Sequence, residues 1–405
     1  MLNSGEKPLR VLAADDSAVM RGIMRTLFQR QAESGRSDLP KMELIGVARD
    51  GVECLEWVDT LTPDVLVLDL EMPRLNGLDV LDRLRSMKRG LPVIMCSSHT
   101  EKGARATLDA LMRGAADYVM KPMGQRDFES ALASLAQQLL PKIAALAAKN
   151  SQRANAVEGT PGARFQSSMG FRPDVTSAPA EIVVIGVSTG GPAALEYLLP
   201  LLARDLPVPV LIVQHMPKLF TGVLAERLDR CCALRVEEAY HGQLLQPGTV
   251  LLAPGDAHME VAPQRFNAWG DERRPRGARV KLHSQEPRNH CRPSADYLFW
   301  SAARMYGVGT LALVLTGMGS DGLDGAREVQ ECGGVVLAQD EATSAVWGMP
   351  GRVSEAGIAY ATLPLDAIAR EVNLRVNARG LKRGGVALRT TEMVGARREI
   401  AHGLY

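Results

Sequence analysis

The sequence predicts an α/β protein of two domains, each built on a mainly parallel sheet. With 405 residues, the chain is too long for a single ordinary core. Two regions alternate short apolar runs with amphipathic stretches, the pattern of strands and helices in a parallel sheet. Between them, residues 150–180 lack periodicity and are rich in Ser, Gly, Pro, Ala and Arg. This composition is typical of a flexible linker, so we expect domains at 1–149 and 181–372.

In the first domain, five apolar runs are each followed by a helix-like stretch, which predicts a doubly wound (βα)5 sheet. The runs are "LRVLAA", "ELIGVA", "DVLVLDL", "PVIMCSS" and "DYVM". A one-sided apolar stripe from about Asp127 to Ala148 predicts the last helix, and we expect this helix to end the domain.

The second domain is predicted to be a Rossmann-like parallel sheet with an antiparallel insertion. Its runs are "EIVVIG", "VPVLIVQH", "TVLLAP", "HMEVAP", "ARVKLH", "GTLALVLTG" and "GGVVLAQ". The shorter middle runs are separated by Gly and Pro, which predicts antiparallel hairpins. Residues 373–405 are rich in Lys, Arg and Gly, and we expect a basic, disordered tail there.

Bulk properties exclude several classes of protein. The net charge of +1 argues against a polyanion-binding protein, so no nucleic-acid partner is expected. Six cysteines without a CxxC pair fit neither a disulfide framework nor a cysteine-rich zinc site, and we expect reduced, mostly buried thiols. The first ten residues lack the apolar core of a signal peptide, and no stretch approaches the length of a membrane span. We therefore expect a cytoplasmic protein that is not embedded in a membrane.

Three acidic residues follow strands of the first domain. Asp15 and Asp16 end the first strand, and Asp69 ends the third. The carboxyl ends of neighbouring strands converge in a doubly wound sheet, so these acids should share a pocket. A single acid at a strand end is often only a helix cap. Three clustered carboxylates repel one another unless a cation lies among them, and oxygen-rich acidic pockets favour Mg²⁺.

Hydroxyl and amino groups are predicted at the same edge of the sheet. Ser97 and Ser98 end the fourth strand, and Lys121 follows the fifth. A lysine and a hydroxyl beside carboxylates can stabilise a transferred phosphoryl group.

With these residues in place, residues 9–130 resemble a response-regulator receiver domain. The resemblance implies phosphorylation by a histidine kinase in the presence of Mg²⁺. It assigns the phospho-acceptor to Asp69, metal ligands to Asp15, Asp16, Asp69 and the carbonyl of Glu71, the switch hydroxyl to Ser97 or Ser98, phosphate contact to Lys121, and the switch aromatic to Tyr118.

The stretch "VVIGVSTGGP" places Ser188 on a predicted turn between a strand and a helix. Three roles are open for this serine: it allows the backbone to bend, it helps to hold a phosphate, or its hydroxyl acts as a nucleophile. The stretch matches neither GxxxxGK[ST] nor GxGxxG, which argues against a phosphate cradle. It matches GxSxG, in which a serine is exposed on a tight turn, although Gly and Ser are common in turns.

A nucleophilic serine needs a base and an acid that orients the base. His215 closes the run "VPVLIVQH", and Asp321 follows another apolar run in "LALVLTGMGSDG". The order Ser, His, Asp differs from that of α/β-hydrolases, but a triad is defined by geometry and not by order. The other histidines of this region follow no core parallel strand, so we expect surface or structural roles for His241, His258, His283 and His290.

The second domain carries several long motifs: "GVSTGGP", "QHMP", "APGDAHM", "NHCRPSADYLF", "LTGMGSDGLDGA" and "AQDEATSAVWGMP". In these it resembles the catalytic domain of the chemotaxis protein-glutamate methylesterases, CheB. The resemblance implies hydrolysis of glutamate γ-methyl esters, and deamidation of certain glutamines, on methyl-accepting chemoreceptors. It implies a cofactor-free esterase reaction with Ser188 as nucleophile, His215 as acid and base, Asp321 as orienter, and Thr189 and the Met318 N–H at the oxyanion site.

The order of the domains suggests that phosphorylation of Asp69 changes how the first domain sits over the active site. Two alternatives remain: a non-enzymatic regulator whose second domain binds a nucleotide or a receptor, and a transcription factor. The chain offers no helix-turn-helix candidate after the linker. The basic stretch "GDERRPRGARVK" and the basic tail are interpreted as solvated surface, or as regions that attract an acidic receptor surface or membrane headgroups.

Overall fold

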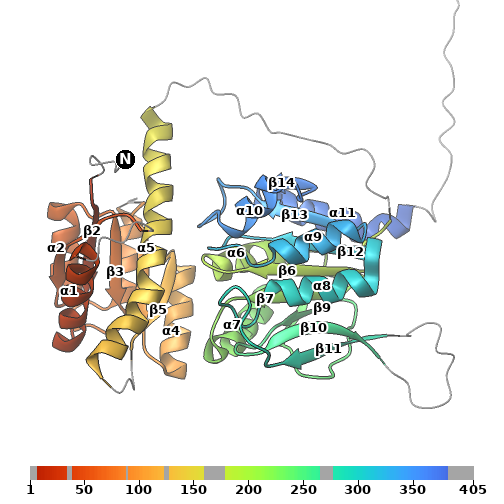
Figure 1. The fold of residues 1–405 in the computed structure, drawn as a ribbon, viewed down its shortest axis with the longest axis horizontal. Coiled ribbons are helices and arrows are strands. Elements are labelled where there is room, and N and C mark those ends of the chain that lie inside the picture. Colours follow the sequence, from red (N-terminus) through yellow and green to blue (C-terminus); the bar gives the residue numbers. More distant parts are fainter. Residues whose placement is uncertain are drawn as a thin grey trace, which may run out of the picture.

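The computed structural model describes residues 7–33, 39–87, 90–122, 127–158, 178–264 and 277–381. They form two α/β units that lie against each other, the first drawn in red to yellow and the second in green to blue (Figure 1). The predicted fold class is confirmed.

The first unit is a five-stranded parallel sheet in the order β2-β1-β3-β4-β5, flanked by helices. Its strands carry apolar residues on both faces because helices cover both sides. The elements are β1 (Leu9–Ala14), α1 (Ala18–Glu33), β2 (Met42–Ala48), α2 (Gly51–Leu61), β3 (Val65–Asp69), α3 (Gly77–Ser86), β4 (Val93–Ser97), α4 (Glu101–Met112), β5 (Asp117–Met120) and α5 (Phe128–Glu158).

Helix α5 is longer than the sequence analysis predicts. It continues to Glu158, so the expectation of a linker from residue 150 is wrong for 150–158. The composition of this segment is polar, but it holds no Gly or Pro before Gly159, and its Ala, Gln, Arg and Glu residues favour helix. The rest of the predicted linker, apart from residues 178–180, lies outside the described residues.

The first part of α5 also corrects an expectation about membranes. By length and composition, Phe128–Ala148 is apolar enough to cross a membrane. However, Leu135, Leu139 and Ile143 are fully buried in the apolar cluster beneath the first sheet. The packing of the core therefore accounts for the apolar character of this helix.

The second unit is a seven-stranded sheet in the order β14-β13-β12-β6-β7-β9-β8, with every neighbouring pair parallel. Its elements are β6 (Ile182–Val187), α6 (Gly191–Leu198), a 3-10 turn (Leu199–Leu201), β7 (Val210–Gln214), α7 (Lys218–Cys231), β8 (Arg235–Glu238), β9 (Thr249–Leu252), β10 (His258–Pro263), β11 (Ala278–His283), α8 (Ala295–Tyr306), a second 3-10 turn (Gly307–Gly309), β12 (Thr310–Val314), α9 (Leu323–Glu331), β13 (Val335–Gln339), α10 (Met349–Glu355), β14 (Ala361–Leu363) and α11 (Leu365–Leu381).

The predicted antiparallel insertion is present as the pair β10 and β11. The run "TVLLAP", in contrast, forms β9, which pairs in parallel with β7 and β8. Strands β8 and β14 were not predicted, because "RVEE" is largely polar and β14 has only three residues. Helix α11 continues beyond Asn373 with Val376 buried, so residues 373–381 belong to the fold and only 382–405 of the predicted tail lie outside the described residues.

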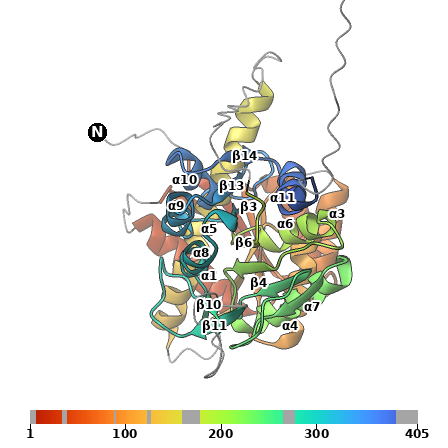
Figure 2. The same cartoon turned by 90° about the vertical axis from the view of Figure 1, so that its right-hand side faces the viewer.

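The strand order predicts where a binding crevice lies on this sheet. Helices α6, α7 and α11 cover one face and α8, α9 and α10 the other, and Figure 2 shows α6 and α8 on opposite sides of β6. Strand β6 lies between β7 and β12, where the chain first moves to one side and later returns to the other. Such a switch point opens a crevice at the carboxyl ends of the strands.

The two units pack through α4 of the first and α6 and α7 of the second (Figure 1). Tyr118 stacks on Phe220 with ring centroids 4.8 Å apart. Arg105 pairs with Glu226 at 3.1 Å, and the guanidinium of Arg227 pairs with a carboxylate of α4, Asp109. Buried apolar residues of both units belong to one continuous cluster.

All six cysteines are free thiols, as expected. Cys54 and Cys96 are buried, and burial raises the pKa of the Cys54 thiol to about 12, which keeps it protonated. The other four are half-buried or exposed, so the expectation of mostly buried thiols is wrong.

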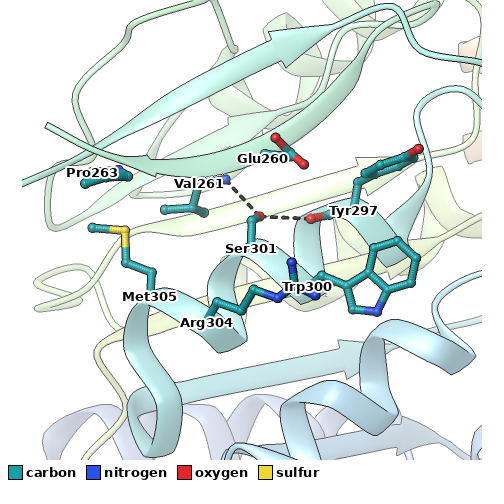
Figure 3. Close-up of a pocket in the computed structure, with 8 residues that line it drawn as sticks. All are labelled: Glu260, Val261, Pro263, Tyr297, Trp300, Ser301, Arg304 and Met305. Carbon is teal, nitrogen blue, oxygen red and sulfur yellow. Dashed lines mark hydrogen bonds between the residues drawn. The ribbon is translucent and has the colours of Figure 1, made fainter.

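A groove of about 660 Å³ lies between β10 and α8 (Figure 3). Ser301 joins its two walls, accepting a hydrogen bond of 2.9 Å from Val261 N and donating one of 2.9 Å to Tyr297 O. None of the predicted site residues lines it.

Candidate active site and phosphorylation site

Ser188 follows the last residue of β6 and is half-buried at the switch point. Its N–H donates to Thr316 O at 2.9 Å, and its carbonyl accepts from Gly191 N at 2.8 Å. Gly190, at φ 76, caps α6, and a side chain there would strike Ala345. The glycines of "STGGP" therefore let the chain turn sharply from strand to helix directly after the serine.

Gln214, the last residue of β7, fixes the neighbouring strand end. Its side-chain amide donates to Ser188 O at 3.0 Å and to His215 O at 3.3 Å. His215 N also donates to Val187 O at 3.1 Å. The backbones that carry the predicted nucleophile and base are thus tied together.

His215 and Asp321 form a buried pair. Nε2 of His215 lies 2.8 Å from Oδ2 of Asp321, and the two side chains are only 11% and 2% exposed. Asp321 also accepts from Ser294 Oγ and Ala295 N, each at 2.6 Å. Since Nε2 donates to the aspartate, Nδ1 is the acceptor in the neutral imidazole.

Opposing effects set the protonation of this pair. Burial alone raises the pKa of Asp321, but hydrogen bonds from His215 and Ser294 outweigh it and bring that pKa down to about 2. For His215, burial lowers the pKa, while the neighbouring Cys291 sulfur and the bond to Asp321 raise it to about 10. The aspartate is therefore ionised and stabilises the charged imidazolium.

Cys291 contacts the other ring nitrogen, with Sγ 3.5 Å from His215 Nδ1. It belongs to the loop that precedes α8. The described structure thus brings His215, Asp321 and Cys291 into direct contact and places Ser188 at the adjoining strand end.

The two residues expected at the oxyanion site both face the first unit. Thr189 is 5% exposed, and its hydroxyl donates to Asp117 Oδ2 of the first unit at 2.6 Å. Met318 packs against the apolar cluster that contains Ile143 of α5. The first unit therefore covers this side of the candidate active site.

The acids of the first unit converge as predicted. Asp15, Asp16 and Asp69 each offer an oxygen within 4.8 Å of the others. Lys121 Nζ lies 3.0 Å from Asp15 Oδ2 and 2.7 Å from Asp69 Oδ2. One ammonium thus faces three carboxylates.

The electrostatics of this cluster fit a divalent cation. Burial and the charge of Asp15 raise the pKa of Asp69 to about 6, and burial raises that of Asp15. The buried oxygens Asp15 Oδ2 and Asp69 Oδ2 have Lys121 as their ion-pair partner and accept no hydrogen bond with good geometry among the described residues. Hard oxygen donors with uncompensated negative charge suit Mg²⁺.

A cavity of about 130 Å³ opens beside Asp69 and is lined also by Asp16, Glu71, Ser98 and Lys121. Ser97 is fully buried and accepts from Thr107 Oγ1 of α4 at 2.6 Å. Of the two candidate switch hydroxyls, Ser98 lines this cavity and Ser97 contacts α4.

Several site residues escaped the sequence analysis. Gln214, Asn289, Ser294 and Thr316 all bond to the predicted residues or their backbones. Gln214 carried a signal, because a polar side chain ends an otherwise apolar, fully buried strand. His258 is fully buried, with ring nitrogens bonded to Ser294 N and Glu286 O at 3.2 Å, in line with a structural role.

Fold and sites together define a regulator in which a phosphate-accepting α/β domain precedes a domain with the side chains of a serine hydrolase. Family models match accordingly: "Response regulator receiver domain" over residues 11–133 and "CheB methylesterase" over residues 183–372. A protein-glutamate methylesterase/protein-glutamine glutaminase of Nocardioides sp. is 42% identical over 91% of this chain and 95% of its own length. One of the same name from Trichodesmium erythraeum is 39% identical over 91% and 99%.

Among solved structures, the catalytic domain of the CheB methylesterase of Thermotoga maritima is 40% identical, covers 48% of this chain and 97% of its own, and has a TM-score of 0.45. The chain belongs to the CheB methylesterase family.

Proposed function

We propose that this protein hydrolyses glutamate γ-methyl esters on methyl-accepting chemoreceptors, and deamidates glutamines there, under control of phosphorylation at Asp69. The activity is that named for its relatives, and it serves chemotactic adaptation. The observation that carries the proposal for this chain is the buried His215–Asp321 pair, 2.8 Å apart, at the strand end beside Ser188. A non-enzymatic binding domain has no need of that pair.

The reaction follows from these groups. His215 takes the proton of the Ser188 hydroxyl, and the oxygen attacks the ester carbonyl. The His215 imidazolium then gives its proton to the leaving group as the tetrahedral intermediate collapses, which breaks the C–O bond and releases methanol, or breaks the C–N bond of a glutamine and releases ammonia. Water then hydrolyses the acyl-serine, and the product is a glutamate carboxylate. Asp321 stabilises the imidazolium in both halves.

Thr189 and the N–H of Met318 complete the proposal as oxyanion donors. A donor of this kind contributes about 3 kcal/mol to transition-state stabilisation. Since Thr189 donates its hydroxyl to Asp117, the first unit competes with this role. Phosphorylation would weaken the contact between the units and so raise the rate.

In the first unit we assign the phosphoryl group to Asp69, with a chemotaxis histidine kinase as donor. Mg²⁺, held by Asp15, Asp16, Asp69 and the carbonyl of Glu71, would neutralise the phosphoryl oxygens. Lys121 and Ser98 would bond to the same oxygens, and Ser97 supports α4 behind them. The esterase half uses only groups of the protein itself and needs no cofactor. We place the protein in the cytoplasm, where these partners are accessible. We propose a receiver domain over residues 1–149, extended by the rest of α5 to Glu158. We propose a catalytic domain over residues 181–372, extended by the rest of α11 to Leu381.

Methanol release from methyl-esterified receptor, with and without a small phosphodonor and Mg²⁺, tests the function. Ser188→Ala should abolish hydrolysis and leave folding and receptor binding nearly intact. Ser320→Ala, which alters an exposed serine of the Asp321 loop, should retain the wild-type rate. Substantial activity in folded Ser188→Ala would place the nucleophile elsewhere.

A further inference from the structure

A four-residue turn, Arg288–Cys291, lies over the His215–Asp321 pair. Arg288 N donates to Cys291 O at 3.1 Å, and Cys291 N donates to Arg288 O at 2.8 Å. The central residues Asn289 and His290 have φ of 50° and 63°. Positive φ at both central positions is the pattern of a type I′ turn. Asn and His are among the non-glycine residues that adopt this conformation most readily, and the two backbone hydrogen bonds close the turn.

The turn contacts both members of the pair. Nδ2 of Asn289 donates to Asp321 Oδ1 at 3.1 Å. From the other end of the turn, Cys291 Sγ lies 3.5 Å from His215 Nδ1. The two ends of one short turn thus contact the aspartate and the imidazole.

A second buried carboxylate faces the same amide. Asn289 Nδ2 also donates to Asp296 Oδ2 at 3.0 Å. Asp296 is fully buried at the start of α8, where it accepts from Gly325 N at 2.7 Å and from Arg288 Nε at 2.8 Å. Burial and the charge of Asp321 raise the pKa of Asp296. The amide of Asn289 therefore places positive N–H dipoles between two carboxylates that would otherwise repel each other.

Arg288 anchors the turn on the outside. Its guanidinium lies 4.3 Å from the ring centroid of Trp300, whose side chain is drawn in Figure 3, and pairs with Asp324 at 2.6 Å. Trp300 belongs to α8 and Asp324 to α9. The turn is thus held against the two helices that cover this face of the sheet.

We infer that Asn289 is a positioning residue for the proposed hydrolysis, holding the Asp321 carboxylate against His215 and separating it from Asp296. This inference rests on the proposed function. With the amide removed, Oδ1 of Asp321 keeps the bond from Ser294 Oγ and Oδ2 keeps the bond from Ala295 N, so the carboxylate loses one of its donors and is held less firmly against the imidazole. With the amide replaced by a carboxylate, a third negative charge joins the cluster.

The pH dependence of hydrolysis depends on all titratable and charged groups close to the His215–Asp321 pair. Those that contact or act on Asp321 and its partners are His215 after β7, Cys291, Arg288 and Arg292 of the loop before α8, Asp296 of α8, Asp324 of α9, and His258 of β10. All of these are unchanged in the variants below, so a shift is attributable to residue 289.

The test uses the full-length protein, activated by phosphodonor and Mg²⁺, with kcat and KM measured from methanol release over a pH series. Asn289→Gly suits the positive φ and removes only the amide. We expect kcat to fall about tenfold or more, as for loss of a hydrogen bond to a charged group, with KM within about twofold. Asn289→Asp should move the acidic limb of the profile to higher pH, because added negative charge stabilises the imidazolium.

His290→Asp is the matched control. His290 is exposed, is the other central residue of the turn with the same positive φ, and gains the same charge without replacing a donor to Asp321. If the acidic limb moves by the same amount in His290→Asp as in Asn289→Asp, the inference is overturned. A wild-type kcat in Asn289→Gly would also overturn it.

A second measurement separates this inference from the proposed function. In the Ser188→Ala background, which should be inactive, NMR titration of the His215 ring gives its pKa without any turnover. Asn289→Asp should raise that pKa and His290→Asp should raise it less. Activity in Ser188→Ala would contradict the nucleophile, whereas an unmoved His215 pKa in Asn289→Asp would contradict the role of Asn289.

Discussion

The hydroxyl of Thr189, the residue that follows the proposed nucleophile, donates a 2.6 Å hydrogen bond to Asp117 of the first unit. Asp117 is 4% exposed, and its other oxygen lies 2.9 Å from Lys142 Nζ. The first unit therefore forms a direct hydrogen bond to a residue of the candidate active site.

Neutralising Asp117 should loosen this contact. Asp117→Asn keeps the shape but weakens the bond from Thr189 and the pairing with Lys142, so the rate of the unphosphorylated protein should rise several-fold. Coupling between sites is typically about 1–3 kcal/mol, enough for such a change. Initial rates of methanol release measure it. Asp82→Asn, which disrupts a surface pair with Arg113, should leave the rate unchanged. An unaltered basal rate in Asp117→Asn would show that the bond has no inhibitory role.

Removal of the whole first unit extends the same argument. A fragment that begins near Pro179 should hydrolyse receptor methyl esters faster than the unphosphorylated full-length chain, because Thr189 and Met318 lose the groups that cover them. Circular dichroism would establish that the fragment is folded before rates are compared. If the fragment is slower, the first unit mainly recruits the enzyme to its receptor, and occlusion is rejected.

Phosphorylation is expected to require Asp69. Asp69→Asn should prevent stimulation by a phosphodonor while preserving the basal rate, because the acidic cluster lies apart from His215 and Asp321. Incorporation of labelled phosphate is the direct measurement, with Asp59→Asn, an exposed acid of α2, as the control. Unreduced labelling of Asp69→Asn would reject the assignment.

The pH dependence of hydrolysis should reflect the raised pKa of His215. A general base acts in its neutral form, so kcat/KM should increase from neutral pH towards about 10. The Cys291 sulfur beside Nδ1 contributes to that pKa, so Cys291→Ser should move the rising limb to lower pH. If the rising limb lies at the same pH in the wild type and in Cys291→Ser, the sulfur does not act on the imidazole.

The same pair contributes to stability in a defined range. The pKa of His215 is raised by folding, so its contribution is complete below about 6.5 and is lost as the pH rises towards about 10. The pKa of Asp321 is lowered, so its contribution is complete above about 3.8 and is lost as the pH falls towards about 2. Denaturant unfolding at several pH values measures both, with Asp321→Asn as the reference.

Most residues of the candidate site could be predicted from the sequence because the ends of the strands can be recognised there. Ser188, His215 and Asp321 each follow a continuous apolar run, and parallel strands bring their carboxyl ends to one edge. The bond from Asn289 to Asp321 was not predictable in this way, since it comes from a loop whose turn depends on contacts with α8 and α9. Helix ends were missed for another reason: polar residues after Ala148 have no apolar periodicity, yet nothing in them breaks a helix before Gly159.

Strand β5 is four residues long and lies at the edge of its sheet beside β4, and on its other side Met120 N and Tyr118 O bond to the side chains of Gln138 and Lys142 of α5. Asp117, at its start, holds Thr189, and Lys121, directly after its end, pairs with Asp69. At about 3.3 Å per residue, the four steps from Asp117 to Lys121 span about 13 Å of extended backbone. Side chains of α5, and no second strand, hold this outer edge, so a lysine drawn towards a phosphoryl group would shift the short strand and displace the aspartate at its other end. Signal input and enzyme output would then share one rigid segment, and the relay would need no unfolding and no large rotation of the domains.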